Sequence, residues 1–269
     1  MHPTIVQIGP FPLHAYGVLL AVSFFLGILL ASRRAPARGI ASEVVFDASL
    51  VIVFAAIFGA RLLYVLFHRD EMHRFLDVFA LWTGGLAMYG GVLAAFAASA
   101  IYLRRRRIPF LVMADVVAPS LGLGLALTRI GCFLNGCCFG HPTTGPLGVH
   151  FPAESYVGRL FEKAAVHPTQ LYSSLTGWLI LLVLLAFDRK PRPTGQLFGL
   201  YLIFDGVGRF ILDFYRYYEP NSYLLGRLTV NQLICIGFFI AGIGLLVRSR
   251  SAAHPVTALS AREVPATEA

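Results

Sequence analysis

The sequence predicts an all-α integral membrane protein of about seven transmembrane helices, and three observations support this fold class. Of the 269 residues, 57% are hydrophobic and only 13% are charged, whereas about a quarter of the residues in a soluble domain are charged. The mean hydropathy is positive, at +0.71. Seven stretches reach the roughly 20 mostly apolar residues that a helix needs to cross the hydrocarbon layer. They lie at about 13–32, 43–67, 85–103, 111–130, 168–187, 195–216 and 229–248.

The basic residues in the connecting segments predict the orientation of these helices. The first stretch has no Lys or Arg before it and three arginines shortly after it, the reverse of a cleavable signal peptide. One set of helix ends carries 13 basic residues and the alternate set carries six. Because basic loops stay in the cytoplasm, we expect the N-terminus outside and the C-terminus in the cytoplasm. The longer loop at 131–167, between helices 4 and 5, then faces outward.

The domain organisation is expected to be simple, because the sequence shows no internal repeat and no soluble second domain. Residues 1–250 are expected to form a single transmembrane domain. Residues 251–269 are polar and contain proline, which is typical of a disordered tail, here on the cytoplasmic side.

Three basic residues, Arg61, Arg129 and Arg209, lie within or at the ends of the apolar stretches. Each opposes insertion by about 2.5–3.5 kcal/mol at a helix centre unless it is paired or hydrated. Snorkelling or a structural ion pair explains a single terminal arginine equally well. The sixth stretch, however, has a stripe of charges at helical spacing, which must face the bundle interior or a water-filled cavity. This stripe consists of Asp205, Arg209, Asp213 and Arg216.

Two or three guanidinium groups at one depth predict an anion-binding site. The planar fork of arginine matches a phosphate bidentately, and the abundant phosphate in a membrane is that of a phospholipid. Arg129 opens the outward-facing loop. We therefore expect a phospholipid headgroup site in the outer half of the bilayer.

Several segments, in order along the chain, resemble the prolipoprotein diacylglyceryl transferase family. The most specific is the signature segment, residues 129–140, which has Asn135 and Gly140 where that family has them. The other similar segments are Leu13–Gly17 with His14 and Tyr16, Gly59–Arg61 with Tyr64, Gly84–Gly85 followed by Tyr89, Gly90 and Gly91, His167–Tyr172, and Arg209 with Asp213, Phe214 and Arg216.

The resemblance implies a transferase of lipoprotein biosynthesis in the inner membrane of bacteria. It would move a diacylglyceryl group from phosphatidylglycerol to the thiol of the lipobox cysteine of a preprolipoprotein signal peptide, forming a thioether and releasing glycerol phosphate. Phosphatidylglycerol, the signal peptide and membrane lipids are the implied partners, without nucleic acid, cofactor or metal. The implied catalytic residues are Arg129, Arg209, Tyr89, Tyr16, His14 and His167. The implied phospholipid-binding residues are Arg61, Arg129, Asn135, Gly140, Arg209, Asp213, Arg216, Gly90 and Gly91.

The sequence departs from the family pattern at four positions. Tyr89 and Cys132 stand where the family has His and Asn, and Cys137 and Ser173 stand where it has Glu. Tyrosine, with a pKa near 10, is a poor general base at neutral pH. The remaining candidates for accepting or orienting a proton are His14, His167, Tyr16 and Asp213, and the arginine charges also favour a thiolate.

Three of the four cysteines form a cluster in the expected outward loop, Cys132, Cys137 and Cys138, while Cys235 lies in the last helix. Three interpretations stay open for this cluster: small buried apolar side chains, a disulfide from Cys132 to Cys137 or Cys138, and a role in catalysis or metal binding. The cysteines also favour an alternative function, a membrane thiol-disulfide oxidoreductase, although there is no Cys-x-x-Cys pair and the intramembrane arginines stay unexplained. A third function, a non-catalytic phospholipid-binding relative, keeps the arginine site.

If Tyr89 positions lipid and removes no proton, replacing it with Phe should lower turnover only modestly and leave the pH profile unchanged. The measurement is the rate of diacylglyceryl transfer to a lipobox peptide as a function of pH. A shift in the alkaline limb of the profile in Tyr89→Phe would show that the phenol titrates in the mechanism.

Overall fold

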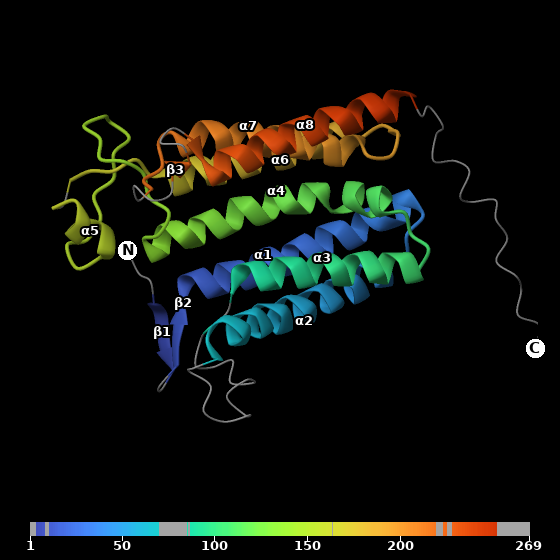
Figure 1. Ribbon diagram of the computed structural model, residues 1–269. Helices are drawn as coiled ribbons and strands as arrows, with labels where there is room; N and C mark the ends of the chain where they lie inside the picture. Colours follow the sequence, from blue (N-terminus) through green and yellow to red (C-terminus); the bar gives the residue numbers. More distant parts are fainter. Residues whose placement is uncertain are drawn as a thin grey trace, which may run out of the picture. The chain divides into compact units, whose positions relative to one another are not determined.

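The computed structural model describes residues 4–8, 11–69, 85, 87–162, 164–218, 223–224 and 228–251. In this part of the chain the regular structure is helical apart from two short antiparallel strand pairs, β1 with β2 and β3 with β4. The elements, labelled in Figure 1 where there is room, are β1 (Thr4–Ile8), β2 (Phe11–His14), α1 (Ala15–Arg34), η1 (Ala35–Arg38), α2 (Ser42–Phe67), α3 (Met88–Arg105), α4 (Phe110–Asn135), α5 (Tyr156–Leu160), α6 (Thr169–Phe187), α7 (Gln196–Asp213), β3 (Tyr223–Leu224), β4 (Leu228–Thr229) and α8 (Val230–Ser251).

Each of the seven expected apolar stretches corresponds to one of the long helices in the described residues. Five of these helices, α1, α2, α4, α6 and α8, are long and apolar enough to cross a membrane. The other two, α3 and α7, have 18 residues each. An all-helical protein with five candidate membrane-spanning helices is therefore confirmed, while seven crossings and the orientation of the termini stay predictions.

Two helix boundaries near candidate site residues differ from the expected ones. His14 closes strand β2 rather than opening the first helix, because residues 11–14 pair with β1. The fourth helix continues through Asn135, so Arg129 lies inside α4 and does not end it. Gly136 follows the helix with φ +72°, the left-handed conformation that glycine adopts most readily after a helix end. The short strands were not predicted from the sequence.

The seventh helix also ends earlier than expected, at Asp213. Arg216 therefore leaves the charged stripe and lies in extended chain, where it forms an isolated antiparallel bridge with Gly140. The expectation of four charges on one helical face is wrong for Arg216, because this residue belongs to the segment that pairs with the signature segment.

The described chain packs as two compact units, one made of residues 1–31 and 114–269 and the other of residues 32–113. The second unit contains α2 and α3, which approach closely at Gly59 and Gly90, since a Cβ atom added to either glycine would collide with the backbone of the other. A single domain over 1–250 stays a prediction. The expected tail at 251–269 lies outside the described residues after Ser251.

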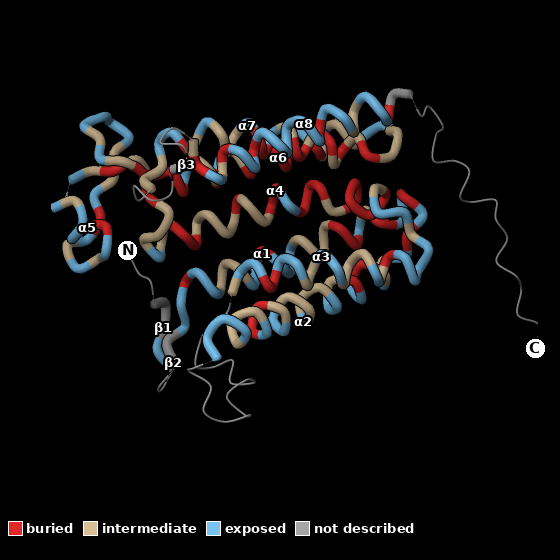
Figure 2. Tube along the Cα trace, viewed as in Figure 1, coloured by how far each residue is buried: buried red, intermediate tan, exposed pale blue. Residues whose placement is uncertain are grey.

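Helix α4 is the central element of the first unit. Of the candidate spans it is the most buried, with 56% of its apolar window inside the structure, and Figure 2 shows buried residues along it and along α6. The hydroxyl of Ser120 on α4 donates to the carbonyl of Gly27 on α1 (2.8 Å). Asp115, also on α4 and fully buried, accepts the backbone N–H groups of Gly195 and Phe198. It thereby supplies the cap that the first turn of α7 requires.

Helices α4 and α6 cross where two glycines meet. A Cβ added to Gly177 would lie 2.6 Å from the backbone nitrogen of Ala126 and 2.9 Å from the carbonyl oxygen of Gly122. Small residues at such crossings let helix backbones approach closely in membranes. Only glycine fits at this position without separating the helices.

Gly177→Ala should therefore destabilise the protein by about 1–3 kcal/mol, the usual cost of overpacking. The matched control is Gly244→Ala in α8, where an added Cβ would meet no atom within 4 Å and where alanine favours the helix by about 0.5–1 kcal/mol. Thermal unfolding of the two variants in detergent compares them directly. Equal midpoints would show that the α4–α6 crossing tolerates separation.

Candidate functional site

The signature segment turns sharply at the end of α4. After Gly136 the chain folds back, so that the backbone N–H of Cys137 donates to the carbonyl of Cys132 (3.1 Å). Cys138 has φ +60°, a left-handed conformation that costs an L-residue roughly 1–2 kcal/mol. The surrounding contacts must stabilise this turn, because its own backbone preference opposes it.

Those contacts come from the start of α6. The side chain of Gln170 donates from Nε2 to the carbonyl of Cys137 (2.7 Å), and the hydroxyl of Thr169 donates to the carbonyl of Cys138 (2.8 Å). Both side chains are buried, and Gln170 is fully inaccessible. Its Oε1 atom has no hydrogen-bond partner among the described residues. The segment from His167 to Tyr172, which the sequence analysis singled out, thus holds the signature segment in place.

Three chain segments meet at Gly140. Its N–H donates to the carbonyl of His167 (3.0 Å), and the next N–H, that of His141, donates to the carbonyl of Tyr215 (2.9 Å). A Cβ at Gly140 would lie 2.5 Å from the Tyr215 oxygen and 2.8 Å from the His167 oxygen. Gly140 therefore allows an approach that brings Arg216 and His167 to the end of the signature segment.

The loop between α4 and α6 has an apolar core of its own. Phe139, Phe151, Val157 and Val166 are buried against one another. Val166 also bridges Val149 and Pro142 as short antiparallel pairs. The expected outward loop is thus a folded segment built on the Gly140 junction, and not a simple connection.

Two of the predicted arginines converge on the turn. The guanidinium charges of Arg129 and Arg216 both act on the thiol of Cys138. Hydrogen bonds with the thiols of Cys132 and Cys137, together with these two positive charges, lower the pKa of Cys138. The two positive charges therefore favour the ionised form of Cys138 within the thiol cluster.

Tyr16 joins the same cluster from α1. Its phenol interacts electrostatically with Arg129 and with the three clustered cysteines. Of these, Cys132 lies in the last turns of α4 and not in the loop where the sequence had placed it. The approach of α1 to α4 is close, since a Cβ at Gly131 would lie 3.3 Å from the Cα of Tyr16. The side chain of Tyr16 is 36% exposed, so it borders the site without being enclosed by it.

Arg209 has a partner of its own within α7. Its Nε lies 2.8 Å from the carboxylate of Asp205, one helical turn earlier, and Asp205 is only 1% exposed. The ion pair compensates the charges of both residues inside an apolar helix. Arg209 is therefore anchored within α7, four residues before the helix ends at Asp213.

Asp213 does not serve as the counter-charge of Arg209. It accepts hydrogen bonds from the hydroxyls of Tyr218 and Thr229 (both 2.6 Å) and from the side chain of Asn231 (2.9 Å). Burial and the bond to Asp213 raise the pKa of the Tyr218 phenol, so Tyr218 stays protonated and donates. The carboxylate thus ties the end of α7 to the start of α8 and fixes the segment that carries Arg216.

The two candidate histidines lie in different settings. His14 is exposed at the end of β2, where it pairs with Thr4. His167 lies in the Gly140 junction, with Nδ1 3.4 Å from the hydroxyl of Tyr172 and its ring against that of Tyr215. The structure therefore places His167 against the signature segment. Asn135, which belongs to that segment, is the last residue of α4 before the turn. None of the described contacts places His14 there.

The unit formed by residues 32–113 holds the remaining candidates. Arg61 is 5% exposed, its Nη1 donates to the carbonyl of Gly85 (3.1 Å), and its guanidinium lies over the ring of Tyr64. Gly90 and Gly91 are buried in the α2–α3 contact. Tyr89 is 72% exposed on α3. Arg61 therefore holds the backbone at Gly85, shortly before α3 begins.

An apolar pocket of about 210 Å³ lies between α7 and α8. Its lining is hydrophobic, and the residues from α7 flank Arg209 in the sequence. The lining residues are Gly206, Val207, Phe210, Ile211, Cys235, Ile236 and Phe239. Sequence analysis missed this pocket and the roles of Thr169 and Gln170, although the last two lie inside a segment that it had selected.

Comparison with known proteins gives one family. The family model described as prolipoprotein diacylglyceryl transferase matches residues 3–248. Three relatives named phosphatidylglycerol–prolipoprotein diacylglyceryl transferase illustrate the similarity. That of Thermosynechococcus vestitus is 39% identical over 86% of this chain and 86% of its own length. That of Synechococcus elongatus is 36% identical over 90% and 85%, and that of Photobacterium profundum is 35% identical over 95% and 96%.

Asp213→Asn should destabilise the protein by about 1–3 kcal/mol, because an amide cannot accept all three hydrogen bonds and a buried donor loses its partner. Asp47→Asn is the control, since Asp47 forms a half-exposed pair with Arg106 and such pairs contribute at most about 1 kcal/mol. Thermal unfolding in detergent and protease sensitivity of the chain after α7 are the measurements. If Asp213→Asn behaved like Asp47→Asn, the carboxylate would not be what fixes Arg216.

Proposed function

Because the chain belongs to the prolipoprotein diacylglyceryl transferase family, we propose that it transfers a diacylglyceryl group from phosphatidylglycerol to a cysteine thiol of a preprolipoprotein. The names of the similar proteins contain both substrates. The acceptor is the lipobox cysteine of the signal peptide, the product is a thioether, and glycerol phosphate is released.

One observation carries this proposal: the junction at Gly140 brings Arg216 to the turn where Arg129 also acts. Both guanidinium charges reach Cys138, although the two arginines are far apart in the sequence. Two guanidinium groups that act on the same thiol have the donors to bind the oxygens of one phosphate. The site therefore fits the headgroup of an anionic phospholipid.

The same arrangement supplies catalysis. As the sulfur attacks the glycerol carbon, the carbon–oxygen bond breaks and the phosphate changes from one negative charge to two. Arginines at the phosphate stabilise this second charge, which is present in the transition state and not in the bound substrate. Arg209, held by Asp205, lies on α7. The apolar pocket between α7 and α8 suits an acyl chain of the phospholipid, which would run along the helices.

The membrane arrangement belongs to the same proposal. We take α3 and α7 to cross the membrane as well, with the N-terminus outside the cytoplasm and the enzyme in the bacterial inner membrane. The distribution of 13 and six basic residues supports this. The loop from 136 to 168 then faces the side on which a signal-peptide cysteine emerges.

Two other functions are distinguished by the same assay. A thiol-disulfide oxidoreductase is favoured only by the cluster of free thiols near the turn, and it would change the redox state of a peptide thiol without adding mass from a lipid. A non-catalytic phospholipid-binding relative would bind phosphatidylglycerol and form no adduct. Purified protein, phosphatidylglycerol and a lipobox peptide, followed by mass spectrometry, separate the three.

Arg129→Lys and Arg209→Lys should each lower adduct formation at least about tenfold, equivalent to roughly 1.4 kcal/mol of transition-state stabilisation, because lysine keeps the charge and loses the planar fork. The loss should lie mainly in turnover, measured against phosphatidylglycerol concentration. Arg106→Lys is the control, since Arg106 is half exposed and pairs with Asp47. Wild-type rates in both variants would refute the phosphate site.

A further inference from the structure

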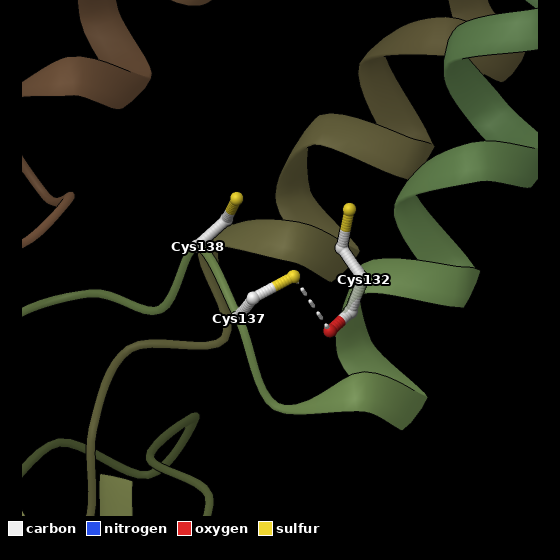
Figure 3. Close-up of side chains that lie close together, drawn as sticks. All are labelled: Cys132, Cys137 and Cys138. Carbon is white, nitrogen blue, oxygen red and sulfur yellow. Dashed lines mark hydrogen bonds between the residues drawn. The ribbon is translucent and has the colours of Figure 1, made fainter. Parts of the chain in front are cut away.

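The thiol cluster, Cys132, Cys137 and Cys138, is the one group of metal-ligating side chains of this kind in the described residues. The three Sγ atoms all lie within 4.8 Å of one another. Figure 3 shows the three side chains gathered at the turn after α4, with the Cys137 thiol donating to the Cys132 carbonyl (3.7 Å). All three thiols are free.

The cluster is held in position by contacts outside itself. The buried Gln170 and Thr169 side chains fix the carbonyls of Cys137 and Cys138, and Cys138 is kept in a left-handed conformation. Cys132 is 6% exposed, whereas Cys137 and Cys138 are half-buried. The three sulfurs are therefore preorganised, and two of the three cysteines are partly accessible.

The geometry suits a zinc ion with three protein ligands. Zinc–sulfur bonds of about 2.3 Å in a tetrahedral arrangement put the sulfurs about 3.8 Å apart, so the cluster needs to contract by only about 1 Å. The four residues between Cys132 and Cys137 also match the ligand spacing common in zinc sites. Three protein ligands leave a fourth position for a substrate, as in catalytic zinc sites.

We propose that Cys132, Cys137 and Cys138 bind a zinc ion whose fourth ligand is the thiol of the substrate cysteine. This inference rests on the proposed transferase function, and it differs from the expectation that no metal is bound. Three thiolates and the substrate thiolate give the zinc centre a net charge of minus two. Arg129 and Arg216, which act on Cys138, compensate this charge.

The metal supplies the thiolate that the reaction requires. A thiol that coordinates zinc loses its proton, which passes to water. The bound sulfur then attacks the glycerol carbon: the carbon–sulfur bond forms, the carbon–oxygen bond breaks, and the bonding electrons leave on the phosphate oxygen. The thioether product is a weaker ligand than a thiolate and leaves the zinc ion. Cys137 stands where the family has a carboxylate and Tyr89 where it has a histidine, so the metal replaces proton-accepting groups that this chain lacks at those positions.

Metal content is the first test. Protein purified in detergent and loaded with zinc should retain about one zinc per chain by elemental mass spectrometry, and the C132S/C137S/C138S variant should retain none. Cys235→Ser, at the cysteine in α8, is the matched control and should retain zinc. Helix content by circular dichroism shows that the triple variant is folded.

Thiol coordination is tested with cobalt in place of zinc. Addition of the lipobox peptide should increase the thiolate-to-cobalt absorption of the wild-type protein, whereas a peptide with Ser in place of the lipobox cysteine should leave the spectrum unchanged. In the adduct assay, chelation of zinc should lower the rate at least about tenfold, and added zinc should restore it. The residual metal-free rate should rise with pH as the peptide thiol titrates near about 8.5.

Each other outcome overturns the inference. A wild-type protein with free thiols that binds neither zinc nor cobalt, a disulfide within the cluster, binding of copper(I) alone, or equal adduct rates with and without zinc would refute it while leaving the transferase function intact. If zinc-loaded protein forms no adduct at all, the transferase function fails, and the cobalt spectrum then decides whether the cluster coordinates a substrate thiol.

Discussion

The close approach of three chain segments at Gly140 is the constraint on which the site depends. Backbone hydrogen bonds join this residue and its neighbour to His167 and Tyr215, and neither oxygen leaves room for a Cβ atom. This junction couples the positions of three segments, because the signature segment, the chain before α6 and the chain after α7 all meet there. Arg216 reaches the turn after α4 only through it. A backbone contact, rather than any catalytic side chain, thus assembles the charges of the site.

The charged residues within the apolar helices are stabilised in three different ways. Arg209 pairs with the buried Asp205, Arg61 donates to a backbone carbonyl, and Asp213 accepts bonds from two hydroxyls and an amide. Each arrangement satisfies a group that would otherwise oppose burial in hydrocarbon. Arg129 and Arg216 differ, because both act on the turn that borders solvent. In the proposed mechanism Arg129 and Arg216 act at the turn, while Arg209 acts from a position fixed by its ion pair with Asp205.

The turn after α4 also shows how one scaffold can change its chemistry. Three thiols occupy a place in which the family pattern has an amide and a carboxylate at two of the positions. Sulfur is softer than oxygen and binds thiophilic metals. The side chains of Thr169 and Gln170 position the backbone that carries two of these thiols. The acid–base properties of the turn therefore differ from those that the family pattern alone implies, although Arg129 and Arg216 are kept.

The sequence by itself determined the helical membrane class, the approximate limits of seven long helices and the family, because apolar length, charge placement and ordered motifs are local properties. It also selected Arg129, Arg216, His167 and Gly140 as candidate site residues, and the structure relates all four to the turn after α4. Only the tertiary structure decided which charges pair: Asp205 with Arg209, and Asp213 with hydroxyls from residues later in the chain. It likewise ended α7 before Arg216 and drew the three thiols together. Asp205 and Asp213 stand at the same spacing from Arg209, and the partners of Asp213 lie beyond α7, so the local pattern does not decide which carboxylate pairs with the arginine.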